Sequence, residues 1–220
     1  MFRKFLSYLL PINIHKQTSE INKSLEISWN NGQLVLDTQN TNYSYGSLQR
    51  ILRKGLLTIG FEKIRTFEKI LILGVAGGSV VKTLVNEIKF EGKIIGVELD
   101  PDIIKIANTY FEIDKIKSLE IILENAEDFL KNKKENFDLI IIDIFQDNFM
   151  PEFLFEEFFI NNVIENLNNN GFIIFNTMIL NGNDKFRNDN YCKQFENNDY
   201  KIIRIDKLEH YNELIIINKL

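Results

Sequence analysis

The chain has 220 residues, of which 45% are hydrophobic, and its formal net charge at pH 7 is −5. A chain of this length can bury a full hydrophobic core, and its acidic balance argues against binding to nucleic acid, which usually needs a basic face. No apolar run approaches the roughly 20 residues that span a bilayer, so we expect no membrane partner.

The chain contains one cysteine, Cys192, and two histidines, His15 and His210. A lone cysteine forms no internal disulfide and suits a reducing compartment. The histidines are far apart and lack the spacing of metal ligands, so we predict no metal site. Residues 1–11, MFRKFLSYLLP, lack the small-residue cleavage site of a secretory signal. We therefore expect a cytoplasmic protein.

Residues 1–60 predict a small appendage, and residues 61–220 predict the main domain. We expect a terminal helix and loop over residues 1–24. The stretch 25–36 alternates on both sides of an Asn-Asn-Gly turn, which predicts a β-hairpin because these residues tolerate positive φ. Apolar residues at helical spacing over 46–60 predict a linking helix.

From residue 70 onward, short apolar runs alternate with helical patterns. The predicted strands are 70–74, 93–98, 119–123, 137–143 and 171–176. The predicted helices between them are 78–89, 101–111, 126–132 and 152–168, the last ending in an Asn-rich run before Gly171. Several of these strands are apolar without alternation, which is typical of parallel strands that helices cover on both faces.

The last part of the chain predicts a helix at 184–197 and two strands, 200–206 and 212–218. Five residues separate the two strands, which is too few for a crossover, so we expect them to pair antiparallel. A closing strand of this kind is typical of class I methyltransferase-like folds. The sequence therefore predicts an α/β fold with a doubly wound, mostly parallel, seven-stranded Rossmann-like sheet and a small N-terminal β-hairpin appendage.

A glycine-rich turn, Gly74-Val75-Ala76-Gly77-Gly78, follows the first strand, and Glu98 ends the second. Such a turn lets a ligand approach the backbone, and an acid at the second position accepts hydrogen bonds from ribose hydroxyls. The alternative is a turn that serves packing alone, and Glu98 makes a nucleoside pocket the better interpretation. The pattern is not G-x-G-x-x-G, so NAD is the weaker choice.

Two further strand ends point to the same crevice. Asn125 precedes a helix, where it can cap the helix or pair with an adenine amino group, and the sequence favours neither. Asp143 ends the fourth strand, where a carboxylate can anchor a substrate or act as a general base. The alternative for Asp143 is a capping or solvated acid.

Five segments resemble, in order, the spermidine synthase-like family: LEISWNNGQLVLDTQNTNYSYGSLQRIL, LILGVAGGS, GVELD, ENAEDFL and DLIIIDIF. The resemblance covers residues 25 to about 180 and implies a class I fold that binds S-adenosyl-L-methionine (AdoMet). Members of the family transfer an aminopropyl group from decarboxylated AdoMet to putrescine, and some relatives are AdoMet-dependent methyltransferases. Dimers are common in the family, and the N-terminal hairpin offers an interface for a homodimer.

The resemblance assigns roles to individual residues. Glu98 matches the ribose-binding acid, Asn125 the adenine-contacting position and Asp143 the catalytic aspartate, which also borders the cofactor. The matching segments place further cofactor-binding residues at Gly74, Gly77, Gly78, Leu99 and Ala126.

The departures from the family lie on the side of the acceptor. The family's glycine loop carries an aspartate where this chain has Gly77. The second acid of the family's Asp-x-x-Asp loop is Gln146 here, with Asp147 displaced by one position. The N-terminal signature appears as Tyr45-Gly46-Ser47, without its glutamate. Tyr45, Gln146 and Asp147 are therefore the expected acceptor-binding residues, although a diamine needs several carboxylates.

Our leading hypothesis from the sequence is an AdoMet-dependent methyltransferase that acts on a small-molecule acceptor. One alternative is a divergent aminopropyltransferase that uses decarboxylated AdoMet. A second alternative is a non-catalytic module that binds AdoMet or a partner protein.

Overall fold

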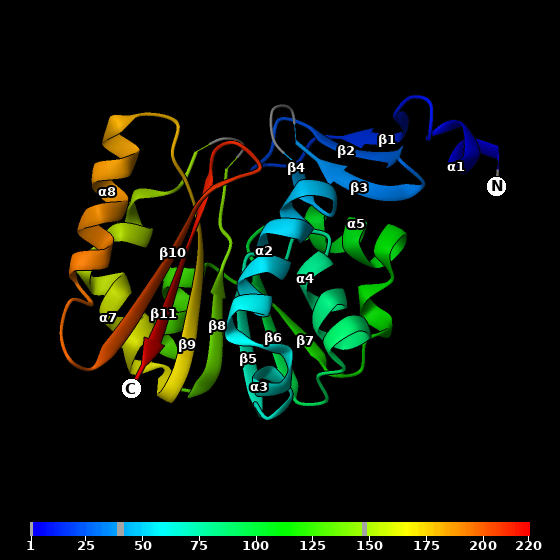
Figure 1. Cartoon of the computed structure of the whole chain (residues 1–220). Coiled ribbons are helices and arrows are strands. Elements are labelled where there is room, and N and C mark those ends of the chain that lie inside the picture. The colour runs from blue at the N-terminus through cyan, green and yellow to red at the C-terminus, as the bar shows by residue number, and fades with distance from the viewer. Residues whose placement is uncertain (1, 39–41, 147–148) are drawn as a thin grey trace.

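The computed structural model describes residues 2–38, 42–146 and 149–220 (Figure 1). The described residues form two sheets, a four-stranded antiparallel sheet near the N-terminus and a seven-stranded main sheet. The N-terminal elements are α1 (Phe2–Leu6), β1 (Ile12–Gln17), β2 (Leu25–Asn30), β3 (Gln33–Asp37) and β4 (Asn42–Ser44), with the strands in the order β1-β2-β3-β4.

The predicted hairpin is confirmed as β2 and β3. Its turn residues, Asn31 and Gly32, both have positive φ, at 48° and 75°. Our expectation of only a helix and loop before residue 25 is wrong, because β1 pairs antiparallel with β2. The alternation of β1 is weak, since all of its residues are exposed or only partly buried, and this explains why the pattern did not reveal it.

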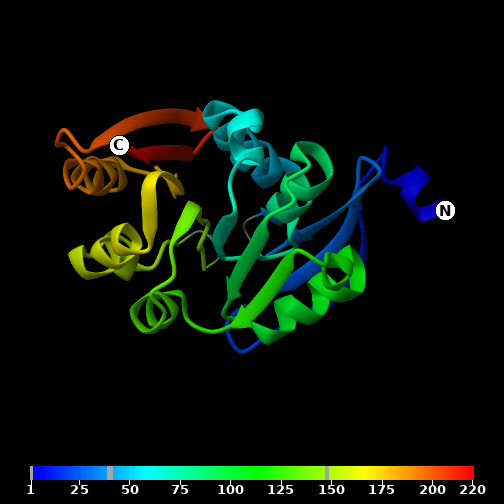
Figure 2. The same ribbon diagram turned by 90° about the horizontal axis from the view of Figure 1, so that it is seen from below.

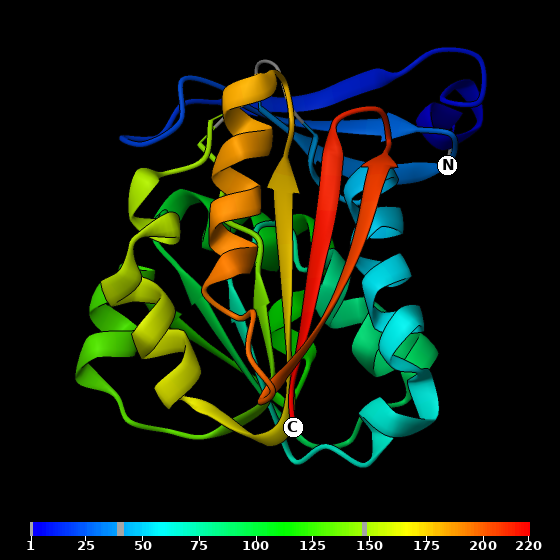
Figure 3. The same ribbon diagram turned by 60° about the vertical axis from the view of Figure 1, so that its left-hand side comes forward.

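The linking helix is confirmed as α2 (Gly46–Ile59), and a short helix, α3 (Phe61–Arg65), follows it. The main sheet has the order β10-β11-β9-β8-β5-β6-β7, in which β11 runs in the direction opposite to the other strands (Figure 3). Its strands are β5 (Lys69–Leu73), β6 (Lys93–Glu98), β7 (Leu119–Leu123), β8 (Phe137–Ile142), β9 (Leu167–Met178), β10 (Tyr200–Leu208) and β11 (Asn212–Lys219). The predicted fold class and the antiparallel closing pair are therefore confirmed.

Helices cover both faces of the main sheet, as the continuous apolar strands require. They are α4 (Ser79–Lys82), which continues as a π-helix at Thr83–Ile88, then α5 (Pro101–Phe111), α6 (Ala126–Asn132), α7 (Glu157–Glu165) and α8 (Gly182–Lys193). Along β5, Leu71 and Leu73 pack in the core under α6, α7 and α8, whereas Ile70 and Ile72 pack in the core under α2, α3 and α4.

The helix predicted at 152–168 is only partly correct. A 3₁₀ turn at Glu152–Phe155 precedes α7, which ends at Glu165, and β9 already begins at Leu167. Leu167 pairs with Phe137, after which the register shifts and Asn170 adopts a φ of 62°. This bulge interrupts the two-residue period of the strand, so the Asn-rich run resembles a helix end.

The N-terminal sheet packs against α5 and forms a third core with it (Figure 2). Ile103, Ala107 and Phe111 of α5 meet Leu25 and Ile27 of β2 in that core. The appendage therefore lies beside the carboxyl ends of the parallel strands. In the described ranges, no helix combines the length and the apolar character that crossing a membrane requires. The division at residue 60 stays a prediction.

Gly74, at the end of β5, offers a test of how closely two strand ends approach. Its φ is +88°, and a Cβ at this position would lie 2.2 Å from the carbonyl oxygen of Asp143. We expect Gly74→Ala to lower the free energy of unfolding by about 2 kcal/mol or more, measured by urea denaturation. Gly182→Ala is the control, since no atom lies within 4 Å of its added Cβ, and its effect should stay within about 0.5 kcal/mol. Equal effects at both positions would contradict the close approach.

Candidate functional site

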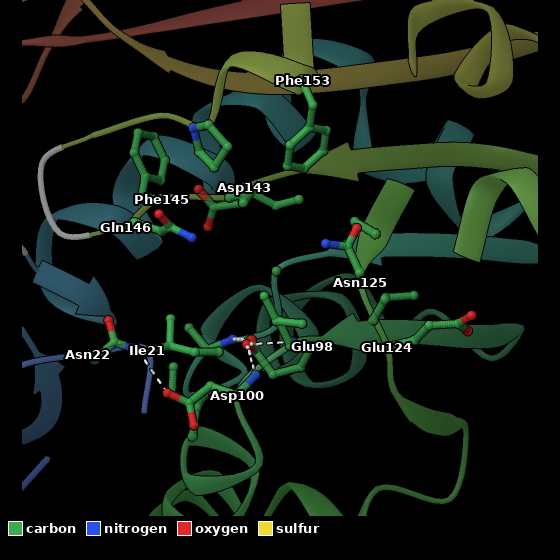
Figure 4. A pocket seen from close by; sticks show the side chains of 18 of the residues that line it. Ile21, Asn22, Glu98, Asp100, Glu124, Asn125, Asp143, Phe145, Gln146 and Phe153 are labelled. Carbon is green, nitrogen blue, oxygen red and sulfur yellow. Dashed lines mark hydrogen bonds between the residues drawn. The ribbon is translucent and has the colours of Figure 1, made fainter. Parts of the chain in front are cut away.

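A cleft opens at the carboxyl ends of β5, β6, β7 and β8, where ligands bind in open α/β sheets (Figure 4). It holds about 800 Å³, counted out to its open mouth. The structure brings seven of the predicted site residues together in its lining: Gly74, Glu98, Leu99, Asn125, Ala126, Asp143 and Gln146. Gly77, Gly78 and Tyr45 are not among the lining residues, and Asp147 lies outside the described residues.

The carboxylate of Glu98 holds the floor of the cleft together. Its Oε2 accepts hydrogen bonds from the backbone N–H groups of Val75 (3.1 Å) and Ala76 (3.0 Å), and its Oε1 accepts from those of Leu99 (2.9 Å) and Asp100 (3.1 Å). Burial raises the pKa of Glu98, while the four amide donors oppose that shift. A ligand hydroxyl at this acid must share an oxygen that already accepts two amides.

Asp143 faces Glu98 from the other side of the cleft (Figure 4). Burial is the main reason that its pKa is raised to about 7, and the nearby negative charge of Glu98 adds to this effect. A hydrogen bond from Nδ2 of Asn176 to Oδ1 of Asp143, at 2.8 Å, acts in the opposite direction. A carboxyl group with this pKa exchanges its proton near neutral pH, as a general base does.

Asn125 fills the helix-capping role that the sequence left open. Its Oδ1 accepts a hydrogen bond from the backbone N–H of Glu127 at 2.8 Å and so caps α6. The same side chain lines the cleft with its amide directed inward (Figure 4). Capping and a contact with a ligand base are therefore compatible at this position.

A segment near the N-terminus forms a wall of the cleft that sequence reasoning missed. Ile21 and Asn22 line the cleft, and Nδ2 of Asn22 donates to Oδ2 of Asp100 at 2.8 Å. The hydroxyl of Ser19 donates to the same oxygen, while Oδ1 of Asp100 accepts from the N–H of Asp102 and caps α5. The Asp-Pro pair at the start of α5 signals the cap, but no local pattern signals partners about 80 positions upstream.

Gly77 faces the N-terminal sheet rather than the cleft. A Cβ at this position would lie 2.8 Å from Cβ of Ser44 and 3.2 Å from the ring of Phe111. The ring of Tyr45 stacks on that of Phe111, with 4.6 Å between the ring centroids, and burial raises the pKa of its hydroxyl. An acidic side chain at position 77 would need the space that β4 occupies.

The charges that line the cleft are all negative. The acids are Glu98, Asp100, Glu124 and Asp143, and no lysine, arginine or histidine belongs to the described lining. Such a cleft favours a cationic ligand over an anionic one. Across the described ranges, no cluster of three or more histidine, cysteine or acidic side chains has the geometry of a metal site.

The model of the spermine/spermidine synthase domain matches residues 51–207. The chain belongs to this family. Over 113 residues it is 31% identical to a polyamine aminopropyltransferase of Vibrio vulnificus (strain CMCP6), a match that covers 50% of this chain and 38% of that protein. The matched segment thus spans well under half the length of this relative.

Solved structures share the fold of this family member. A spermidine synthase in complex with the transition state analogue AdoDATO superposes with a TM-score of 0.71 at 20% identity, covering 95% of this chain and 74% of that chain. Human methyltransferase-like protein 13 in complex with SAH gives a TM-score of 0.64 at 18% identity, covering 80% of this chain and 82% of that chain. At these identities the likeness shows the class I fold alone.

The contact between Gly77 and Ser44 can be tested with a double-mutant cycle. We expect Gly77→Ala to lower the free energy of unfolding by about 1–3 kcal/mol, because its Cβ overpacks against β4. Ser44→Gly removes the two atoms that the new Cβ would meet most closely, so the double variant should recover about 1 kcal/mol or more relative to additivity. Additive effects in urea denaturation would show that the two positions do not press on each other.

The charge of Asp143, which desolvation makes unfavourable, should reduce stability as the pH rises. Because its folded pKa of about 7 lies above its ordinary value of 3.8, the unfolded chain releases this proton first, and stability falls between about pH 4 and pH 7. We expect Asp143→Asn to raise the melting temperature at pH 8 by about 2–4 °C, which corresponds to about 1 kcal/mol, and to have little effect near pH 4. Asp206→Asn, at an exposed position, is the control and should change the melting temperature at neither pH 8 nor pH 4. A lower melting temperature for Asp143→Asn at pH 8 would contradict the raised pKa of Asp143.

Proposed function

We propose that this chain is a transferase that binds an adenosyl sulfonium, AdoMet or decarboxylated AdoMet, and passes one of its carbon substituents to a small-molecule amine. The observation that carries the proposal is the position of Asp143. It is a carboxyl group with a pKa near 7, and it lies across an acidic cleft from Glu98 at the carboxyl edge of the sheet. We also propose that the protein acts in the cytoplasm and as a homodimer.

The residues present fit this group of cofactors. The acidic lining suits a sulfonium cation, and Glu98 is placed to accept hydrogen bonds from ribose hydroxyls. Leu99, Asn125 and Ala126 would hold the adenine, since they combine apolar surface with an amide. Gly74 also lines the cleft, and its lack of a side chain lets the turn after β5 lie against the backbone of Asp143.

The sulfonium makes its attached carbon electrophilic, so the reaction needs a neutral amine held in line with that carbon. At neutral pH an amine is mostly protonated, and Asp143 in its ionised form would take a proton from the ammonium before the nitrogen attacks. The new nitrogen–carbon bond would form as the carbon–sulfur bond breaks, and the sulfur would leave as a neutral thioether. Ile144, Phe145 and Phe153 line the cleft beside Asp143 and give that side an apolar surface. On this proposal the chain contributes orientation and proton removal.

Aminopropyl transfer is the first candidate reaction. The sequence alone led us to prefer methyl transfer, but the comparisons support the alternative better, because the family is named for spermine and spermidine synthases and the curated relative is a polyamine aminopropyltransferase. On this proposal the acceptor is a diamine, and Gln146 would contact it from the loop after β8, as would Asp147, which lies outside the described residues.

Methyl transfer is the second candidate, and the environment of Gly77 favours it. Ser44 and Phe111 fill the space beside this residue, so the loop offers no carboxylate to the amine of an aminopropyl group. Methyltransferase-like protein 13 shows that the same fold occurs in a protein named as a methyltransferase. The choice of donor thus distinguishes the two candidates.

The decisive assay compares both donors. We expect purified protein to form an aminopropylated product from decarboxylated AdoMet and putrescine; a methylated amine formed from AdoMet would favour the second candidate. Asp143→Asn should lower kcat by about 10²-fold or more, whereas the exposed Asp206→Asn should leave it unchanged. The rate should rise with pH through about 7, where Asp143 loses its proton.

Calorimetry with AdoMet, decarboxylated AdoMet and S-adenosylhomocysteine separates binding from turnover. If none binds with a Kd below about 1 mM, which corresponds to about −4 kcal/mol, the transferase proposal fails. Binding without turnover on any amine would support a non-catalytic module instead.

A further inference from the structure

We propose that Asn176 is a positioning residue for Asp143, and that Asn212 fixes which end of the Asn176 amide faces the cleft. The inference rests on the proposed role of Asp143, and it adds a hydrogen-bonded relay of three side chains that reaches from the cleft to β11. The relay crosses three adjacent strands of the sheet.

Two hydrogen bonds define the relay. Nδ2 of Asn176 donates to Oδ1 of Asp143 at 2.8 Å, and Nδ2 of Asn212 donates to Oδ1 of Asn176 at 3.0 Å. An amide has one donor end and one acceptor end. Because Asn212 occupies the oxygen of Asn176, the nitrogen has to face Asp143; the reversed orientation would set two oxygens against each other, and two NH₂ groups as well.

The environment makes this hydrogen bond important. Asn176 is fully buried. Glu98, at the end of β6, places a negative charge near Asp143 and so disfavours the ionised form of the Asp143 carboxyl group. Asp100 and Glu124 add negative charge to the lining, and no cation belongs to its described part. Within the described chain, Asn176 is the side chain that donates to the Asp143 carboxylate, and it leaves Oδ2 to an incoming amine.

The direction of β11 explains why Asn212 lies within reach of Asn176. β11 runs antiparallel to β9, with Leu214 opposite Asn176 and Asn212 opposite Met178. The first residues of β11 therefore lie at the edge where the parallel strands end. A parallel strand in that place would bring its last residues to the cleft instead, so the antiparallel closure delivers Asn212 to the relay.

The test uses Asn176→Ala and Asn212→Ala, with Asn218→Ala as the matched control. Asn218 lies on the same strand, but its amide donates to the backbone oxygens of Gly171 and Lys219, away from the cleft. The first readout is the apparent pKa of Asp143. It is measured from the pH dependence of the ¹³C carboxyl resonance of Asp143 in labelled protein, and Asp143→Asn identifies that resonance. The second is the pH profile of kcat/KM.

We expect Asn176→Ala to raise the apparent pKa of Asp143 by about one unit, because the ionised form loses a hydrogen bond. Asn212→Ala should shift it in the same direction, since the Asn176 amide is then free to turn its oxygen toward the carboxylate. Both variants should shift the acid limb of the pH profile of kcat/KM to higher pH and should lower kcat. The KM for the cofactor should change less than twofold. Asn218→Ala should change neither readout.

A merely structural role would lower the melting temperature without moving the resonance titration, and that result overturns the inference. If Asn212→Ala matches Asn218→Ala, the orienting role of Asn212 is overturned. Should Asn176→Ala fail to fold, Asn212→Ala still decides, because its side chain is only partly buried. If no variant and no parent protein shows turnover, the resonance titration tests the relay by itself, so failure of the proposed function is distinguishable.

Discussion

The carboxylate of Glu98 is the interaction on which the site depends. Four backbone amides converge on it, two from the turn after β5 and two from the turn before α5. A buried acid is costly unless it is hydrogen-bonded in this way, so the strand end and both turns are held in one arrangement. Asp100, one of the four donors, extends that arrangement to the N-terminal segment through Asn22. The floor and one wall of the cleft are thus parts of a single hydrogen-bonded unit.

The N-terminal sheet does more than cover α5. By placing Ser44 against Gly77 it fills the space beside the glycine loop, and by holding Ile21 and Asn22 over β6 it completes the cleft. The composition of the loop and the position of the appendage are therefore coupled. Both contacts join the N-terminal sheet to the loops of the main sheet, so neither belongs to the main sheet alone.

Much of the fold was predictable because its signals are local. The apolar runs of β5, β6 and β8, the glycine turn, and the acids Glu98 and Asp143 all lie within short segments whose pattern fixes their place at the strand ends. The rest depends on distant contacts. The pairing of β1 with β2, the bulge in β9 and the contact of Gly77 with Ser44 join segments whose own sequences carry little sign of the partner. Asn176 and Asn212 escaped notice for the same reason, since each looks like an ordinary polar residue in its strand.

The place of β11 between β9 and β10 bears on the order in which the molecule folds. The glycine turn, Glu98 and Asn125 belong to consecutive βαβ units, whose contacts close over short stretches of chain. The environment of Asp143 is complete only when a strand beginning at residue 212 has docked beside β9. That strand is synthesised after the glycine turn, Glu98 and Asn125, because the N-terminal parts of a chain are made first. The part of the cleft around Glu98 and Asn125 therefore has a route to early assembly during synthesis, whereas the surroundings of Asp143 are complete only after β11 has docked.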